Sequence, residues 1–186
     1  MIKLVGIDPG HGIETGGKRS PVKLGLPVLR EYEFNRSVAW ATEQALNRCG
    51  VSYLRTVADN TDARWNARLK AAHGCKLFIS IHANAGGGTG IETFYSPGSD
   101  ASQRLARLVN AGVVANTEMR DRGIKTANLW VTRETPKRGM VACLVECGFM
   151  DNAGDLAKLR THDYKMACGV GIARGVCLYL GIPYTA

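Results

Sequence analysis

The chain has 186 residues, 45% of them hydrophobic, which is enough for one sizeable core and predicts a single domain over residues 1–186. Its 24 Lys and Arg residues outnumber 16 Asp and Glu residues, but they are spread singly, which argues against a nucleic-acid-binding arm. The net charge of +8 favours a polyanionic partner, and bacterial wall polymers meet that description as well as nucleic acid does. No window holds the roughly 20 apolar residues that a membrane span requires.

The N-terminal segment leads directly into a folded element. Residues 1–7 are too short for the apolar region of a signal peptide, and no small-residue cleavage site follows them. We interpret them as the first strand and expect a protein that is made in the cytoplasm without a signal peptide. Six cysteines lie among apolar neighbours without a C-x-x-C pair, a pattern typical of reduced, buried thiols and not of a cysteine-rich zinc site.

Strand and helix patterns alternate along the chain. Short apolar runs predict strands at 4–7, 51–56, 77–81, 90–95, 128–132 and 141–146. Helical spacing predicts helices at 31–48, 62–73, 99–117, 155–159 with Asn152 as its N-cap, and 163–180. Residues 12–30, rich in Gly, Pro and basic residues, predict a long loop. The pattern indicates an α/β fold with about six strands in a mostly parallel twisted sheet and helices on both faces.

Three of the predicted strands end in polar residues. The apolar runs of the first, third and sixth strands lead to His11, His82 and Glu146. Ligands of open α/β sheets bind beyond the carboxyl ends of the strands, so these side chains are expected to lie near one another. On the sixth strand, the two-residue period places Glu146 and Cys147 on opposite faces, and Cys147 is expected to pack away from that edge.

Two of these residues suit a metal ion. Two histidines and one carboxylate form an established ligand set for catalytic zinc, which keeps one position open for water. Glu31, at the start of the predicted helix after the 12–30 loop, can supply the carboxylate, and Glu33 competes with it. Taken singly, each residue also has a structural explanation, such as a turn for a histidine or the helix macrodipole for a glutamate.

Four blocks of the sequence together resemble a known family. They are residues 8–12 (DPGHG), 31–35 (EYEFN), 80–84 (SIHAN) and 145–152 (VECGFMDN). In this order and at these distances they resemble the four signature blocks of zinc-dependent N-acetylmuramoyl-L-alanine amidases of the type 3 class. The resemblance extends from residue 2 to about residue 182.

The resemblance implies hydrolysis of the amide between the lactyl group of N-acetylmuramic acid and the first L-alanine of the peptidoglycan stem peptide. It makes His11, Glu31 and His82 the ligands of one Zn²⁺ per chain and Glu146 the catalytic carboxylate. It favours Glu31 over Glu33 because the family's metal-binding glutamate stands four residues before an asparagine. Zinc would activate water at neutral pH, and Glu146 would take the water proton and return it to the leaving amine.

Loops near this edge are expected to set specificity. The segments expected to surround the zinc are residues 12–30, 85–89 and 132–137. Trp130, together with Arg133, could hold glycan or stem peptide, and a place for Trp130 in the core is an equal alternative.

Four other residues have two interpretations each. Asp8 could orient His11 and Asn84 could hold a loop or the substrate, although both residue types also form turns. Arg64 and Arg68, four apart on a predicted helix, could contact substrate or form surface salt bridges.

The expected partner is peptidoglycan, with no nucleic acid, no membrane span and a monomeric state favoured. No separate wall-binding domain is expected, which resembles a phage or prophage lysin that reaches the wall after the membrane is permeabilised. Two alternatives remain open. One is a zinc peptidase that cuts within the stem peptide, and the other is a non-catalytic wall-binding module, which has no need for Glu146.

Overall fold

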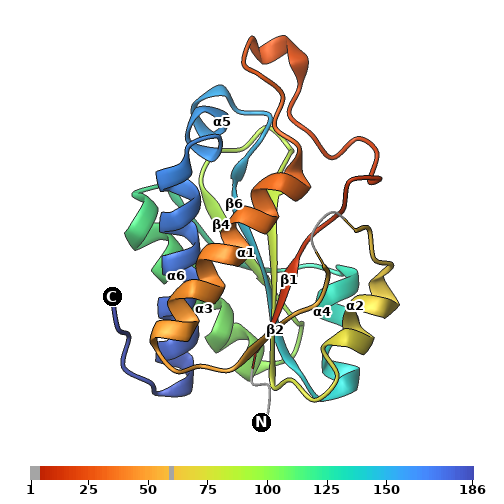
Figure 1. Cartoon of the computed structure of the whole chain (residues 1–186), viewed down its shortest axis with the longest axis vertical. Coiled ribbons are helices and arrows are strands. Elements are labelled where there is room, and N and C mark those ends of the chain that lie inside the picture. The colour runs from red at the N-terminus through yellow and green to blue at the C-terminus, as the bar shows by residue number, and fades with distance from the viewer. Residues whose placement is uncertain (1–4, 59–60) are drawn as a thin grey trace.

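The computed structural model describes residues 5–58 and 61–186, which form one sheet with helices on both faces (Figure 1). The strand order is β2-β1-β3-β6-β4-β5. The strands are β1 Val5–Pro9, β2 Tyr53–Arg55, β3 Leu77–Asn84, β4 Ile91–Tyr95, β5 Asp121–Thr126 and β6 Val141–Phe149. All neighbouring pairs are parallel except β4 with β6. The expected α/β fold with a mostly parallel, six-stranded sheet is confirmed.

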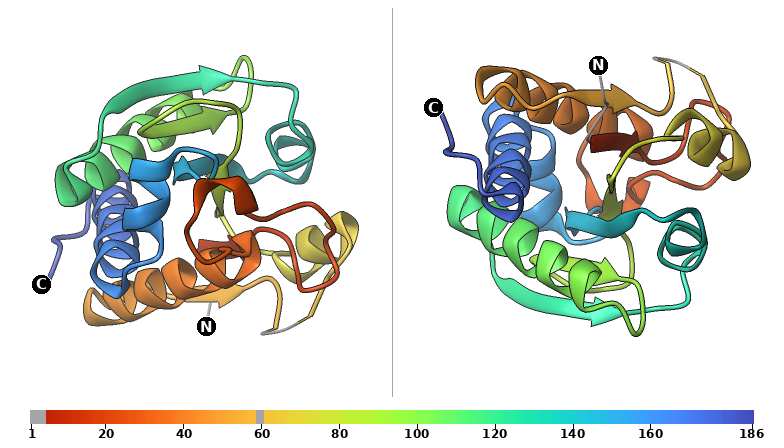
Figure 2. Two further views of the ribbon diagram at one scale, coloured as in Figure 1. Left: turned by 90° about the horizontal axis from the view of Figure 1, so that it is seen from above. Right: turned by 90° about the horizontal axis from the view of Figure 1, so that it is seen from below.

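Three long helices cover one face of the sheet and two short ones cover the other (Figure 2). The long helices are α1 Glu31–Arg48, α3 Asp100–Thr117 and α6 His162–Leu180. The two short helices are α2 Trp65–Ala71 and α4 Trp130–Glu134, and a third, α5 Ala153–Leu159, follows β6. The 3-10 turns η1 Val22–Leu24 and η2 Pro136–Arg138 lie in loops.

The two faces of the sheet have separate hydrophobic cores. Ile79 and Ile81 of β3 pack with the long helices, whereas Phe78 packs with α2 and α4. This division follows from the strand period, because successive side chains point to opposite faces. Ser80 and His82 therefore continue the α2/α4 face beyond Phe78, toward the carboxyl end of the strand.

Helices α3 and α6 approach each other closely at glycines. A Cβ added to Gly171 would lie 2.6 Å from the carbonyl oxygen of Gly112, and one added to Gly175 would lie 2.5 Å from the Cα atom of Val109. The missing side chains let the two backbones come into contact, which any larger residue would prevent.

The strand predicted at 128–132 is wrong. The fifth strand is β5, Asp121–Thr126, and Trp130 begins α4 instead. β5 is an edge strand whose residues are exposed or half-buried, among them Arg122 and Lys125. Charged residues are common on edge strands, so β5 lacks the apolar alternation by which a strand is found in sequence.

The other predicted elements are present with shifted ends. The strand predicted at 77–81 continues to Asn84 and that at 141–146 to Phe149, while the strand predicted at 51–56 shortens to Tyr53–Arg55 and the helix predicted at 62–73 to Trp65–Ala71. The first strand begins at Val5 within the described residues, and residue 4 lies outside them. The predicted N-cap is confirmed, since the Asn152 side chain accepts a hydrogen bond from the Asp155 backbone.

All six cysteines are thiols, and five of them are buried, as expected. Cys147 packs in the larger core, on the face opposite Glu146. Within residues 5–58 and 61–186, each helix is too short or too polar to cross a lipid bilayer.

Candidate metal centre

The carboxyl ends of β1, β3 and β6 lie side by side at one edge of the sheet. β3 pairs in parallel with both neighbours, and its His82 is the register partner of Glu146 on β6. His11 follows the last residue of β1 by two positions. The structure therefore brings together the three side chains expected at this edge, which all line one pocket.

A carboxylate from α1 completes a compact donor cluster. The candidate ligand atoms of His11, Glu31 and His82 all lie within 4.8 Å of one another. Glu31 Oε1 is 2.9 Å from His82 Nδ1 and 3.4 Å from His11 Nε2, and the Glu31 residue is only 2% exposed. Glu33, the competing residue, is exposed and accepts a hydrogen bond from the Tyr32 hydroxyl.

The 12–30 loop returns to the sheet edge because its base is closed by backbone hydrogen bonds. Arg19 and Arg30 form an antiparallel bridge, and the Glu31 N–H donates to the carbonyl of Lys18. Asn35, one turn into α1, donates through Nδ2 to the Gly10 carbonyl at 3.0 Å. These contacts fix the first turn of α1 against the end of β1, which places the Glu31 carboxylate.

The backbone of His11 is held by two arginines. His11 has a φ of 60°, in the left-handed region that non-glycine residues seldom adopt. Its carbonyl oxygen accepts hydrogen bonds from Arg36 Nη1 at 3.1 Å and Arg68 Nη2 at 2.9 Å. Such a conformation costs of the order of 1 kcal/mol and persists where surrounding contacts enforce it, as the two guanidinium groups do here.

Arg68 is buried, so its interpretation as a surface salt-bridge residue is wrong, while it does line the pocket, which leaves substrate contact as a prediction. Its Nη1 donates to Asp8 Oδ1 at 2.9 Å and to the Pro9 carbonyl at 2.7 Å, while Nε donates to the Ala63 carbonyl. Its planar fork thus ties α2 to the last residues of β1. Arg64 lies one turn earlier, is exposed, and lines the mouth of the pocket.

Asp8 reaches the cluster through a serine. Ser80 Oγ donates to Asp8 Oδ2 at 2.8 Å and lies 3.1 Å from His82 Nε2. Since the serine proton is directed at Asp8, the remaining hydrogen bond is one in which His82 Nε2–H donates to Ser80. In the neutral ring, that tautomer has its lone pair on Nδ1, the atom that faces Glu31, where a metal ion can bind. The acidic partner expected for His11 therefore orients His82.

The two imidazoles of the metal-free cluster differ in their protonation. Burial lowers the pKa of the His11 imidazole to about 4, so this ring is neutral at pH 7. Burial opposes ionisation of Glu31, but the hydrogen bond and charge of His82 hold the pKa of this carboxyl below its ordinary value. Burial likewise opposes protonation of His82, but the hydrogen bond and charge of Glu31 raise the pKa of the ring above its ordinary value.

Glu146 carries a buried carboxylate oxygen that is not held by a hydrogen bond within the described part of the chain. Its Oε2 atom is buried and has no hydrogen-bond partner among the described residues. Burial raises the pKa of this carboxyl to about 7, and the charges of Glu31 and Glu92 act in the same direction. A carboxyl poised near neutral pH can both accept and donate a proton.

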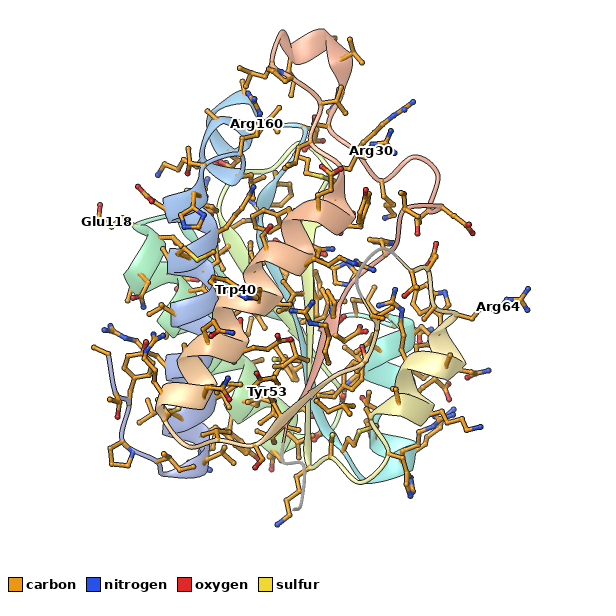
Figure 3. The ribbon with its side chains drawn as sticks, viewed as in Figure 1. Arg30, Trp40, Tyr53, Arg64, Glu118 and Arg160 are labelled. Atoms are coloured by element: carbon orange, nitrogen blue, oxygen red, sulfur yellow. The ribbon has the colours of Figure 1, made fainter. Side chains whose placement is uncertain are left out.

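The cluster lies in a pocket of about 630 Å³ between the sheet edge, α2 and α4. His11, His82 and Glu146 line its polar part, and Trp65 and Trp130 line its apolar part. Of the three loops expected around the site, 12–30 contributes lining residues, whereas 85–89 and 132–137 do not in the described structure. The side-chain view shows α2 and α4 together beside one face of the sheet, with Arg64 at the start of α2 pointing outward (Figure 3).

Three contributors at this edge were not found in the sequence. Ser80 stands two residues before His82 and so shares its face, a relation that the strand period could have revealed. Arg36 and Trp65 had no local signal, because their roles depend on contacts with His11 and Trp130 from distant elements. Asn84, for which two interpretations were open, donates to Glu92 and so holds the strand next to β6.

The chain matches the family described as N-acetylmuramoyl-L-alanine amidase over residues 5–177. It belongs to this family. The amidase CwlM of Bacillus licheniformis is 35% identical to it over 182 residues, which cover 95% of this chain and 68% of that protein. The sporulation-specific amidase of Bacillus subtilis is 34% identical over 181 residues, with 95% and 67% covered.

Solved structures of amidases have the same fold. The catalytic domain of CwlV, an N-acetylmuramoyl-L-alanine amidase from Bacillus (Paenibacillus) polymyxa var. colistinus, superposes with a TM-score of 0.86 at 32% identity and covers 97% of this chain and 99% of its own. The amidase from Clostridium difficile 630 has a TM-score of 0.87 at 30% identity, with 96% and 97% covered. The chain is thus a cell-wall amidase, and the pocket at the sheet edge is its candidate active site.

Proposed function

We propose that this amidase holds one zinc ion with His11, Glu31 and His82, and that it cleaves the amide between N-acetylmuramic acid and L-alanine with Glu146 as the catalytic carboxylate. The donor cluster supports the metal. Ligand atoms of a tetrahedral zinc site, about 2.0–2.1 Å from the ion, lie roughly 3.3 Å from one another. The contacts of 2.9 and 3.4 Å around Glu31 Oε1 are close to that spacing.

The chemistry of the donors points to the same ion. Two imidazoles and one carboxylate form a catalytic zinc set with an open position. The bond between Ser80 and His82 Nε2 fixes the ring so that Nδ1 faces Glu31, as a ligand atom must. When bound, zinc supplies Lewis-acid chemistry that polarises a substrate carbonyl and activates water.

Glu146 performs the proton transfers. Its carboxylate accepts the proton of the attacking water and then, as the carboxylic acid, gives that proton to the amine nitrogen of L-alanine as the C–N bond breaks. An amide nitrogen leaves poorly unless it is protonated, so the second transfer is the more demanding one. The single observation that carries this role is the buried, unpartnered Oε2 atom beside the donor cluster.

Digestion of purified peptidoglycan tests the bond that is cut. Mass spectra should show stem peptides with a free N-terminal L-alanine and glycan strands of undiminished length. Fragments cut between peptide residues would support the zinc peptidase instead, and binding without any cleavage would support the wall-binding module.

Substitutions test the residue roles. Glu146→Gln should lower the turnover number at least about a thousandfold while the protein still binds one equivalent of zinc. Glu31→Gln should lose stoichiometric zinc, whereas the neighbouring Glu33→Gln should keep it, because Glu33 is exposed outside the cluster. Full zinc content in Glu31→Gln would contradict the ligand assignment.

We also propose an endolysin-like role for this amidase. The catalytic domain of the CD27L endolysin has a TM-score of 0.72 to this chain at 21% identity, which is a likeness of fold. A relative at 34% identity is named as a sporulation-specific amidase, so a cellular role is the competing interpretation. Wall clearing from outside, compared with clearing after membrane permeabilisation, would test the lysin role.

A further inference from the structure

We propose that Trp65 and Trp130 form a stacking platform for the amino-sugar ring of the substrate. This inference rests on the proposed function, since it assigns the part of the same pocket that takes the glycan side of the scissile amide. The ligand class is an uncharged N-acetylated pyranose.

The two tryptophans come from different short helices and meet at the pocket. Trp65 is the first residue of α2 and Trp130 the first residue of α4. Their ring centroids are 5.2 Å apart with an angle of 69° between the planes, an edge-to-face arrangement that fixes both rings. Both line the pocket that also contains His82 and Glu146.

The burial of the two rings differs in a way that suits binding. Trp130 is half-buried and packs on the smaller core, whose members include residues of α2 and β6. Trp65 is 56% exposed. Five other large hydrophobic residues of the described chain are exposed, but Trp65 is the only one of the six that lines this pocket. Trp130 therefore anchors the pair, and Trp65 presents apolar surface to a ligand.

Of the two sides of the scissile amide, the sugar is chemically better suited than the peptide to contact the two tryptophans. A pyranose ring exposes a patch of C–H groups on each face, which matches a flat indole in size and polarity. The peptide side begins with alanine, whose methyl group is too small to cover such a platform. Peptide carboxylates suit a cation better, and Lys18 lines the pocket beside Glu31.

Two substrates with the same scissile amide test the platform. One is a disaccharide-linked stem peptide, and the other is the same peptide carrying only a lactyl group in place of the sugar. In the zinc-loaded enzyme, Trp65→Ala should raise the KM for the first substrate about tenfold with little change in kcat, and leave the second unchanged. Trp65→Phe should restore most of the affinity, because a flat aromatic ring is retained.

Controls separate stacking from structure. Trp40→Ala removes a tryptophan that is 50% exposed on α1 but does not line the pocket, and it should leave both KM values unchanged. Trp130→Phe should keep its packing on the core, so a selective KM effect there would support the pair as a unit.

Direct binding gives a readout that does not depend on turnover. Peptide-free disaccharide should quench the tryptophan fluorescence of the Glu146→Gln enzyme, and Trp65→Ala in that background should abolish the saturable quenching. An equal rise in KM for both substrates, or unchanged saturable quenching without Trp65, would overturn the platform. Failure of the wild-type enzyme to cleave either substrate would contradict the proposed function, while the quenching would still decide the sugar site.

Discussion

Arg68 Nη2 donates a hydrogen bond of 2.9 Å to the backbone carbonyl of His11, so a buried guanidinium on α2 controls the conformation of a candidate metal ligand. The same side chain neutralises Asp8, which orients His82 through Ser80. Two of the three donors therefore depend on one residue that contacts neither imidazole ring.

Replacing Arg68 should weaken metal binding. A lysine has one ammonium group and cannot reach Asp8, the Pro9 carbonyl and the His11 carbonyl together, so Arg68→Lys is expected to lower zinc affinity about 10- to 100-fold. Competition with a chromophoric chelator measures this. Lys70→Gln, an exposed change on the same helix, is the matched control. Equal zinc affinity in both variants would contradict the role of Arg68 in positioning the metal ligands.

Glu146 should make the stability of the metal-free protein depend on pH. Its pKa is raised from 4.5 to about 7 in the folded state, so the folded protein binds the proton more tightly than the unfolded chain does. The free energy of unfolding should therefore fall as the pH rises from about 4.5 to 7.

Glu146→Gln removes this titration. The variant should be about as stable as the wild type at pH 4.5 and more stable by roughly 3 kcal/mol at pH 8, since one pKa unit corresponds to about 1.4 kcal/mol. Urea unfolding with a chelator present, at both pH values, measures the difference. A constant difference would show that Glu146 does not titrate in this range.

The contact between α3 and α6 should not tolerate a methyl group. At Gly171 a Cβ would overlap backbone atoms of Gly112 and Val113, which cannot rotate away. Gly171→Ala is expected to lower the free energy of unfolding by about 2 kcal/mol despite the better helix propensity of alanine. Gly16→Ala, where a Cβ meets open space, should change it little. Similar values for the two variants would argue against close backbone contact.

Asp155 should be required to fix the end of β6. Its carboxylate accepts hydrogen bonds from Thr89 Oγ1 at 2.7 Å, the Gly90 backbone at 3.0 Å and the Phe149 backbone at 2.9 Å. Asp155→Ala would leave buried N–H groups without partners and should cost about 3 kcal/mol. Asp163→Ala, in the exposed first turn of α6, serves as the comparison in thermal unfolding. A loss no larger than that of the control would contradict this role.

The sequence predicted most of the fold because buried parallel strands and long amphipathic helices carry strong periodic signals. β3 and α1 were found with nearly correct bounds, since Ile79, Ile81, Phe34 and Val38 are all buried where their periods require. β5 was missed because it lies at an edge. A strand was predicted instead at 128–132, at the start of α4, because the short apolar run around Trp130 has the composition of a strand.

At the candidate site, strand ends and motif order are sufficient to predict that His11, His82 and Glu146 lie in one region. The supporting residues could not be found in this way. Arg36 and Arg68 act on the His11 carbonyl from helices that pack on opposite sides of β1, and no local pattern encodes such a contact. The exposure of Trp65 likewise depends on how α2 packs against the rest of the fold, which no local pattern encodes.

The donor cluster draws its members from the end of β1, the start of α1 and the interior of β3. An ion held there would cross-link the chain into two rings, one closed over residues 11–31 and the other over residues 31–82. Such rings restrict the unfolded chain far more than the folded one. The ion would therefore stabilise the folded state of the N-terminal half. Removal of the ion would then loosen the 12–30 loop first. The metal at the reaction centre would therefore also stabilise the loop that lines part of its pocket.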